Sequence, residues 1–250
     1  MLKKRIIPTL LLDNRHLVKT IKFSNPKYVG DPLNAIKIFN EKFVDELIIL
    51  DISKKNKNKM INYDFLKDLF SECFVPVTYG GGILSLRDAD AIFKLGVEKI
   101  CINTAVFKNE NIIKEFSSNF GSQSIVVSVD ICRDIFNRIS IYNHEKDKKI
   151  NNLDLREYLK KIENLGAGEI LINSVNKDGT MNGMDLKLIE LTYNVVNLPI
   201  IYTGGIGSIT HIKEAFRYNI SGVSGGSFFI FYGPYKAVLI SYPHEEFERL

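Results

Sequence analysis

The chain has few cysteines and no long hydrophobic run, and both features limit the classes of protein to which it can belong. Cys73, Cys101 and Cys132 are the three cysteines in 250 residues, and their spacing gives no C-x-x-C pair, which excludes a disulfide framework and a zinc site of that type. No stretch approaches the ~18 consecutive apolar residues of a membrane helix. The first apolar run ends at Asp13 without a small-residue cleavage site, so we expect a strand there and no leader. We therefore expect a protein of the reducing cytoplasm with no membrane partner.

The chain also carries little net charge. Its 33 basic and 29 acidic residues give +4, which is too small to indicate a nucleic-acid partner but would favour a phosphorylated ligand if the excess lies near a cleft. The composition is 45% hydrophobic and 25% charged, which is typical of a globular protein with a large core and excludes disorder. No metal and no cofactor is expected.

Short apolar runs alternate with segments of helical spacing along the whole chain. The runs predict eight strands, beginning at residues 5, 46, 75, 99, 124, 169, 198 and 221. Helical spacing lies between them, as at 31–43, 85–95, 152–165 and 208–218. Apolar strands joined by helices indicate a parallel sheet covered by helices, and eight such units in ~250 residues predict a closed α/β barrel, the (β/α)8 or TIM barrel. We expect one domain over residues 1–250, with a doubly wound open sheet as the alternative.

An internal repeat favours the barrel. A shift of 123 residues places VPVTYGGGI (75–83) on LPIIYTGGI (198–206), with Pro76 on Pro199. The same shift, without a gap, carries Glu46 onto Glu169. Agreement at both ends of the strands predicts two pseudo-symmetric half-barrels.

Glycines and small polar residues follow several predicted strands. In a barrel these positions share one face, where active sites are built. Glycine lets backbone N–H groups approach an anion, and a helix beginning there adds partial positive charge. The repeat supplies two such sets, so the sequence predicts a ligand with a phosphate at each end. The two sets are Gly82, Asn103 and Thr104, and Gly205, Gly226 and Ser227.

Charged residues at or after strand ends are further candidates. Asp130 closes SIVVSVD, where a carboxylate either transfers protons or fixes neighbouring backbone. Asp51 ends another strand, and Asp178 lies in NKDGTMNG, where a simple Asp-Gly turn is the alternative to ligand contact. Lys19 follows the first strand in an expected loop and could close over a phosphate, or could be a solvated surface lysine.

Four charges precede apolar runs at the opposite strand ends. Arg5, Glu46, Lys99 and Glu169 comprise two positive and two negative side chains. Burial of such charges is tolerable only when they are paired, so we expect a neutral ring of ion pairs that plugs the barrel bottom. Solvated charges at strand starts are the alternative.

These residues together resemble a known family, the cyclase subunit of imidazole glycerol phosphate synthase. The resemblance covers nearly the whole chain. It rests on KRIIP (4–8), GDP (30–32), DELIILDI (45–52), GGGI (80–83), INTAV (102–106), FGSQ (120–123), VD (129–130), LGAGEILINS (165–174), DGT (178–180) and GG (204–205).

The resemblance implies a barrel that binds a glutaminase subunit at its N-terminal face, receives ammonia there and carries it through the interior. At the other face, ammonia would attack a ribulose-linked aminoimidazole carboxamide nucleotide with two phosphates, giving imidazole glycerol phosphate and a carboxamide ribotide. By the same resemblance, the four charges are the ammonia gate and Asp130 is a catalytic aspartate. One phosphate would be held by Gly82, Asn103 and Thr104, and the other by Asp178, Gly179, Gly205, Gly226 and Ser227, with Lys19 closing over them.

The chain departs from the family at the end of the first strand. A second catalytic aspartate stands there in the family, in a CLD pattern, whereas this chain has TLL with Leu11 at that position. Leucine cannot transfer a proton, and Asp13 lies two residues, ~6.6 Å, further along. Smaller departures are Asn173, Thr203 and Ile230.

Three functions therefore stay open at this point. The chain is a histidine-pathway cyclase with an unrecognised second group, or it is a paralogue that passes ammonia to a sugar amidotransferase making amidino groups on surface glycans. A single-chain sugar-phosphate isomerase is the third, but it also needs the missing aspartate and leaves the four charges unexplained.

Overall fold

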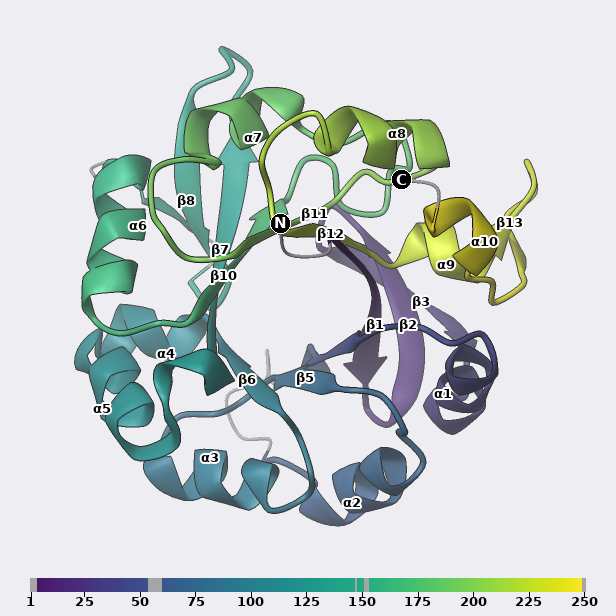
Figure 1. Cartoon of the computed structure of the whole chain (residues 1–250), viewed down its shortest axis with the longest axis horizontal. Helices are drawn as coiled ribbons and strands as arrows, with labels where there is room; N and C mark the ends of the chain where they lie inside the picture. Colours follow the sequence, from purple (N-terminus) through teal and green to yellow (C-terminus); the bar gives the residue numbers. More distant parts are fainter. Residues whose placement is uncertain (1–3, 54–59, 147, 151–152, 249–250) are drawn as a thin grey trace.

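A closed barrel forms the centre of the molecule. The computed structural model describes residues 4–53, 60–146, 148–150 and 153–248, and eight strands within them pair in parallel around a complete ring (Figure 1). The ring is β1 (Arg5–Asp13), β4 (Leu47–Asp51), β5 (Val77–Gly80), β6 (Lys99–Ile102), β7 (Ile125–Arg133), β10 (Glu169–Ser174), β11 (Ile200–Thr203) and β12 (Gly222–Gly225). Because β7 pairs with β10 and β12 pairs with β1, the sheet has no break, so the predicted (β/α)8 barrel is confirmed and the open sheet is wrong.

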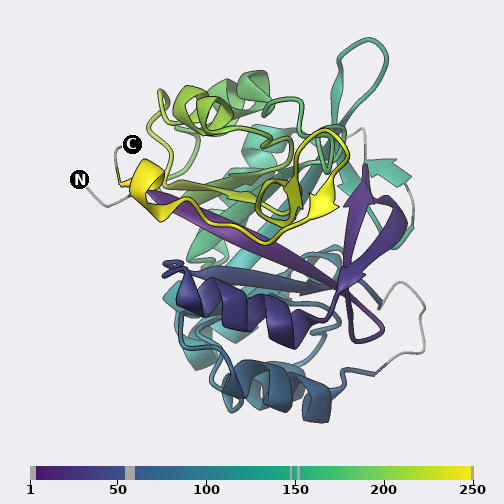
Figure 2. The ribbon, with the colours of Figure 1, turned by 90° about the vertical axis from the view of Figure 1, so that its right-hand side faces the viewer.

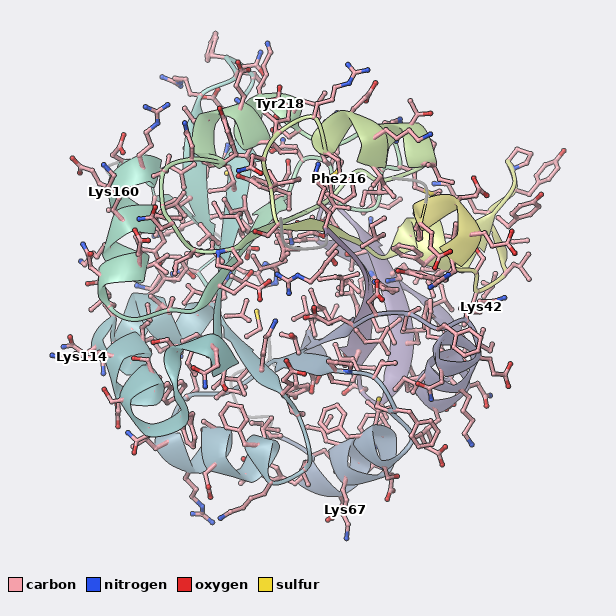
Figure 3. All side chains as sticks on the ribbon, in the orientation of Figure 1. Lys42, Lys67, Lys114, Lys160, Phe216 and Tyr218 are labelled. Carbon is pink, nitrogen blue, oxygen red and sulfur yellow. The ribbon has the colours of Figure 1, made fainter. Side chains whose placement is uncertain are left out.

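Helices form a ring outside the strands (Figure 1). They are α1 (Pro32–Glu41), α2 (Tyr63–Ser71), α3 (Leu86–Phe93), α4 (Thr104–Lys108), α5 (Asn111–Phe120), a 3₁₀ turn η2 (Ser122–Ser124), α6 (Leu155–Asn164), α7 (Leu186–Thr192), α8 (Ile209–Ala215), α9 (Ser227–Ile230) and α10 (His244–Phe247). Lys67, Lys114 and Lys160 project from this ring to the outside (Figure 3). Each helix with an apolar stripe therefore packs that stripe on the strands and leaves its charged face exposed.

The predicted repeat extends to the helix caps. Six helices begin at a side chain whose oxygen accepts a hydrogen bond from a backbone N–H in the first turn, which satisfies one of the donors left over at a helix start. The six caps fall into three pairs that are each 123 residues apart: Asp31 and Asp154, Asn62 and Asp185, and Ser85 and Ser208. The two half-barrels therefore share their start signals as well as their strands.

Two hairpins lengthen the C-terminal face. The segment expected to be a loop after the first strand forms β2 (His16–Ile21) and β3 (Ser24–Gly30), with β2 antiparallel to β1. In the second half, β8 (Ile139–Asn143) and β9 (Lys148–Ile150) continue β7 in the same way. A third hairpin joins β13 (Phe231–Tyr232) to β14 (Ala237–Val238). Figure 2 shows the β2–β3 hairpin at the opposite side of the barrel from α10.

The apolar residues form two separate clusters. The larger cluster fills the space between strands and helices. A small second cluster lies within the barrel and consists of Ile7, Ile48, Cys101, Val126, Leu171 and Ile201. Strand side chains alternate in direction, so these residues belong to the inward set of each strand. In the part of the chain that the structure describes, no helix has both the length and the apolar character needed to cross a bilayer.

Candidate functional site

A pocket of about 940 Å³ lies at the carboxyl ends of the strands. All eight barrel strands, or the turns directly after them, contribute to its walls. The eleven pocket residues selected from the sequence all line it: Lys19, Asp51, Gly82, Asn103, Thr104, Asp130, Asp178, Gly179, Gly205, Gly226 and Ser227. The four charged residues selected at the other ends of the strands do not line this pocket.

Asp130 is buried in the pocket wall with two amides beside it. The Nδ2 atom of Asn103 donates to Asp130 Oδ2 at 2.9 Å, and Asn173 lies beside Asp130 in the register of β7 with β10. Burial raises the pKa of Asp130 to about 7, since a desolvated carboxylate is disfavoured; the two amides lower it and the charge of Asp178 raises it further. A carboxyl with such a pKa can both donate and accept a proton near neutral pH.

The wall related to Asp130 by the repeat is apolar. Asp130 lies beside Asn173 in the β7–β10 register, and Leu11 lies beside Leu50 in the β1–β4 register. Leu50 and Asn173 are 123 residues apart, so Leu11 occupies the position in the first half that Asp130 occupies in the second. Asp13 lines the pocket further along β1, where it pairs with His16. One wall of the pocket thus carries a buried carboxyl beside an amide, and its pseudo-symmetric wall carries two leucines.

Lys19 lies neither in a loop nor in solvent, contrary to what the sequence pattern suggests. It lies in strand β2 instead of a loop, and it is 5% exposed instead of solvated. Its Nζ donates to Thr9 O at 2.6 Å, and a Cβ on Gly226 would lie 2.3 Å from the same Nζ. Burial lowers the pKa of Lys19 to about 8, and the charge of Asp178 opposes that change. The hairpin continues strand β1, which the sequence pattern alone did not indicate, and it inserts the amine beside the start of α9.

Asp178 hydrogen-bonds to the β2–β3 hairpin beside the pocket. Its carboxylate accepts from Thr20 Oγ1 at 2.9 Å and from Phe23 N at 3.2 Å. Burial raises its pKa, while these two donors and Lys19 lower it. Gly179, with φ of +66°, lies so close to the hairpin that a Cβ would be 2.0 Å from Thr20 O. Both residues therefore support the hairpin as well as lining the pocket.

A second hairpin meets the first above the pocket. The ring of Phe23 in the β2–β3 turn contacts the ring of His144 edge-on, at 5.4 Å between centroids, and also contacts Tyr142. Phe23 and His144 both line the pocket. The two halves of the repeat thus each supply one hairpin to a cover over the site.

The two predicted anion cradles occupy equivalent places. Asn103 precedes Thr104 at the start of α4, and Gly226 precedes Ser227 at the start of α9. Gly82 and Gly205 follow β5 and β11 with φ values of +72° and +94°, which favour glycine. Asp51 lies at the end of β4, where its carboxylate accepts from Ser53 N at 2.9 Å.

At the opposite end of the barrel, the four other charges form one ion-pair network. The Arg5 guanidinium is 2.7 Å from Glu169 Oε1 and 3.0 Å from Glu46 Oε2. The Lys99 ammonium is 2.8 Å from Glu169 Oε2 and 3.6 Å from Glu46 Oε1. Burial alone would lower the pKa of Arg5, but the glutamates more than offset it and the pKa is raised. The alternative of solvated charges is wrong, because both glutamates are buried.

The interior between the two ends is apolar. The six-residue apolar cluster inside the barrel forms the next layer above the charged network. Ile7, Cys101 and Leu171 each lie two residues after a member of that network, and alternate strand residues face the same side. Five of the six residues two further along are polar, as with Thr9, Asn103 and Asn173, and Leu50 is the exception. The barrel therefore has a charged end, an apolar middle and a polar mouth.

Sequence reasoning missed several polar residues of these layers. Thr78 Oγ1 donates to Glu46 Oε1 at 3.2 Å within the charged network. Thr9 and Ser224 share a short hydroxyl–hydroxyl contact beneath Lys19, and Thr20 contacts Asp178. Counting in steps of two from Arg5 along the first strand would have found Thr9, because alternate strand residues face the same side. Among the described residues, no three His, Cys, Asp or Glu side chains lie close enough to hold a metal ion.

The chain is similar to proteins of histidine biosynthesis over most of its length. The profile of the family described as histidine biosynthesis protein matches residues 5–236. A protein of Pseudomonas aeruginosa, provisionally named imidazole glycerol phosphate synthase subunit hisF2, is 46% identical over 97% of both chains. A HisF protein of Leptospira interrogans, also named provisionally, is 44% identical over 98% of this chain and 97% of its own. The synthase subunit HisF of Methanocaldococcus jannaschii is 39% identical over 87% of both chains.

We expect Arg5→Met to destabilise the fold by about 3 to 5 kcal/mol, because it leaves two buried glutamates facing a single lysine. Lys94→Met is the matched control: it breaks an exposed pair with Asp90 at 2.6 Å and should change stability by less than about 1 kcal/mol. Urea unfolding followed by circular dichroism measures both. Equal effects of the two substitutions would contradict the buried network.

We expect Asp130→Asn to stabilise the protein at pH 8 but not at pH 4. The pKa of Asp130 is about 7 in the fold against an ordinary 3.8, so ionisation costs the folded state free energy that grows from pH 4 and is complete above pH 7. The gain should be on the order of 2 to 4 kcal/mol at pH 8. Thermal melts at several pH values test this, with Asp134→Asn as the control. Because hydrogen bonds from Arg138 help to lower the pKa of Asp134, its replacement should bring no gain at pH 8.

Proposed function

Since this chain belongs to the histidine biosynthesis protein family and is a HisF-like cyclase subunit, we propose that it uses ammonia to convert a bis-phosphorylated ribulosyl aminoimidazole carboxamide nucleotide. The products are imidazole glycerol phosphate and aminoimidazole carboxamide ribotide. The observation that carries the proposal is that one barrel holds a charged network at one end and, at the other, a pocket lined by glycine turns, helix starts and a buried carboxyl.

The pocket suits a ligand with a phosphate at each end. The first cradle consists of Gly82, Asn103 and Thr104, and its pseudo-symmetric counterpart includes Gly205, Gly226 and Ser227. Backbone N–H groups at such glycine turns and helix starts favour an anion. Lys19 lies against Gly226 with its ammonium buried, so it adds positive charge to the second cradle, where Asp178 and Gly179 complete the wall.

The interior suits a small neutral molecule. An apolar layer of six side chains separates the charged network from the pocket, and desolvation would exclude an ion from it. Ammonia is small and neutral, whereas ammonium is charged. Entry past Arg5, Glu46, Lys99 and Glu169 needs only local rearrangement of ion pairs that exchange partners, because each cation contacts both glutamates.

Asp130 is the group we propose for proton transfer. As an acid it would protonate the ribulose carbonyl oxygen as ammonia adds to that carbon, and the carbinolamine would then lose water to give an imine. Its buried position excludes competing water, and Asn103 and Asn173 hold the carboxyl in place. The wall that faces Asp130 has Leu11 at the equivalent position, so no carboxyl there can make a second proton transfer.

The leucine pair favours a second candidate function. Leu11 and Leu50 leave no acid or base at the position that mirrors Asp130, which would lower the rate of cyclisation by ~10² to 10⁴ if a positioned group is required there. A barrel that still conducts ammonia but cyclises poorly could supply a sugar amidotransferase in amidino-sugar synthesis. Two relatives that are 46% and 42% identical to this chain carry the names hisF2 and hisF3. Such numbering fits additional HisF copies that have a separate role.

We also propose that a glutaminase subunit docks at the charged end. Phe43 and Phe74 precede β4 and β5 at this end and are 76% and 80% exposed. They are neighbours, since Phe74 N donates to Asn40 Oδ1 one turn before Phe43. Exposed aromatic pairs beside a buried charged opening are typical of an interface centre.

Co-expression with the glutaminase subunit encoded in the same genome should yield a complex on size-exclusion chromatography. Replacing both Phe43 and Phe74 by serine should weaken the complex at least about tenfold, because two aromatic anchors are lost. Phe136→Ser, which alters a ring 72% exposed in the β7–β8 turn at the other end, is the control and should leave affinity unchanged. If the wild-type chain forms no complex, the proposal of a glutaminase partner is wrong.

The deciding assay supplies the purified chain with ammonium chloride and the two-phosphate nucleotide. Formation of imidazole glycerol phosphate by the wild-type chain supports the cyclase, and its absence supports the ammonia-supplying function. We expect Leu11→Asp to raise the rate by at least about tenfold, since it restores a carboxyl opposite Asp130. Leu12→Asp, which would place the charge in the core between strands and helices, is the control that should not gain activity.

A further inference from the structure

We propose that Lys108 is the cation that binds the phosphate at the first cradle, and that it exchanges Glu145 for this phosphate. The inference rests on the proposed two-phosphate ligand and adds a pair of residues that selects for it. The first cradle consists of Gly82, Asn103 and Thr104, and none of these side chains carries a charge.

The pocket holds few positive charges for a ligand with two phosphates. Among the described residues that line it, Lys19 and Lys108 are the two lysines, and there is no arginine. Carboxyl groups are more numerous in the same lining: Asp13, Asp51, Asp130, Glu145 and Asp178. Two phosphates bring further negative charge into a partly enclosed space, so each lysine has a large effect on binding. Lys19 lies against Gly226 in the second cradle, which leaves Lys108 for the first.

The place of Lys108 on α4 directs its side chain toward the first cradle. Thr104 begins this helix and Lys108 ends it, four residues later. Residues four apart lie on the same face of a helix, about 6 Å apart along its axis, and helical side chains point back toward the N-terminal end. The Lys108 side chain therefore runs in the direction of Thr104, and both residues line the pocket.

Lys108 contacts a carboxylate that lines the same pocket. Its Nζ lies 2.9 Å from Oε1 of Glu145, which is in the turn between β8 and β9. The Lys108 side chain is 51% exposed and the Glu145 side chain 23%, and an ion pair this open to water is weak. A phosphate that approaches Lys108 carries more charge than the carboxylate and also repels it. Both effects favour the exchange of Glu145 for the ligand.

The second cradle has a lysine and a carboxylate that are held in place. Lys19 is buried, and the carboxylate of Asp178 acts on its charge. Asp178 also accepts two hydrogen bonds from the β2–β3 hairpin, so it cannot turn away without releasing them. In the part of the chain that the structure describes, Lys108 is the one partner of the Glu145 carboxylate. Only the first cradle therefore has an acid that can leave at little cost.

The exchange makes the first cradle selective for charge. An uncharged end of a ligand gains nothing when Lys108 parts from Glu145, and it leaves the pair as it is. A phosphate gains the ammonium and moves the carboxylate away. The pair thus favours a ligand with a phosphate at both ends over one with a phosphate only at the second cradle.

The test measures binding of the two-phosphate nucleotide and of inorganic phosphate to the purified chain, by calorimetric titration at fixed ionic strength. Lys108→Met keeps the length of the side chain and removes its charge. It should weaken nucleotide binding at least about tenfold, as expected for a lost hydrogen bond to a charged group. Glu145→Gln removes the competing charge and should tighten binding about threefold, as expected for a weak ion pair.

Lys161→Met is the control for the loss of a lysine. It breaks a pair with Glu110 that is similarly exposed, and neither residue is in the pocket lining. Nucleotide affinity should equal that of the wild-type chain. In the double variant of Lys108→Met with Glu145→Gln, the gain from the glutamine should shrink, because no ammonium is left to release. Unchanged affinity in Lys108→Met, or weaker binding in Glu145→Gln, would overturn the exchange.

The two probes separate this inference from the proposed function. A wild-type chain that does not bind the nucleotide contradicts the two-phosphate ligand. Inorganic phosphate then decides on Lys108, since its binding should fall in Lys108→Met and rise in Glu145→Gln whatever the nucleotide does. Equal binding of phosphate by the three chains, or none by any of them, would overturn the role of the lysine.

Discussion

The pairing of β7 with β10 is the constraint on which the rest of the molecule depends. It completes the ring of parallel strands, and once the ring is complete every second residue of each strand must face the interior. The interior therefore has to be filled in layers by side chains two residues apart. In this chain the layers differ in chemistry, and their order from charged to apolar to polar gives the barrel a direction.

The cost of burying charge explains how the two ends differ. At the end of the barrel with the charged network, two cations lie beside two buried glutamates, so each glutamate has a cation within 3.0 Å and the network is neutral. At the mouth, burial raises the pKa of Asp130, because the neutral Asn103 amide that donates to it does not compensate its charge. The same physical penalty thus produces a stable plug at one end and a titratable group at the other.

Much of this was predictable because strand ends and repeats are local signals. The eight strands, the pocket position of Asp130 and the partners of Arg5 all follow from apolar runs and the residues that flank them. Lys19 was not predictable in the same way. Its burial depends on the β2–β3 hairpin, which is held by contacts from Thr20 and Phe23 to Asp178, more than 150 residues away. Thr78 was missed because its partner Glu46 directly precedes the neighbouring strand β4, and only the register of β4 with β5 brings them together.

The unequal walls of the mouth have a consequence for any ligand that spans it. The glycine turns and helix starts of the two predicted cradles are alike, so these parts alone would not distinguish the two ends of a doubly charged molecule. Asp130 and Asn173 on one side, against Leu11 and Leu50 on the other, remove that degeneracy. An ancestor with two identical halves would have had no means to distinguish head from tail. These four side chains, together with Lys19 at one cradle, give the site a polarity across the barrel, at right angles to the barrel axis.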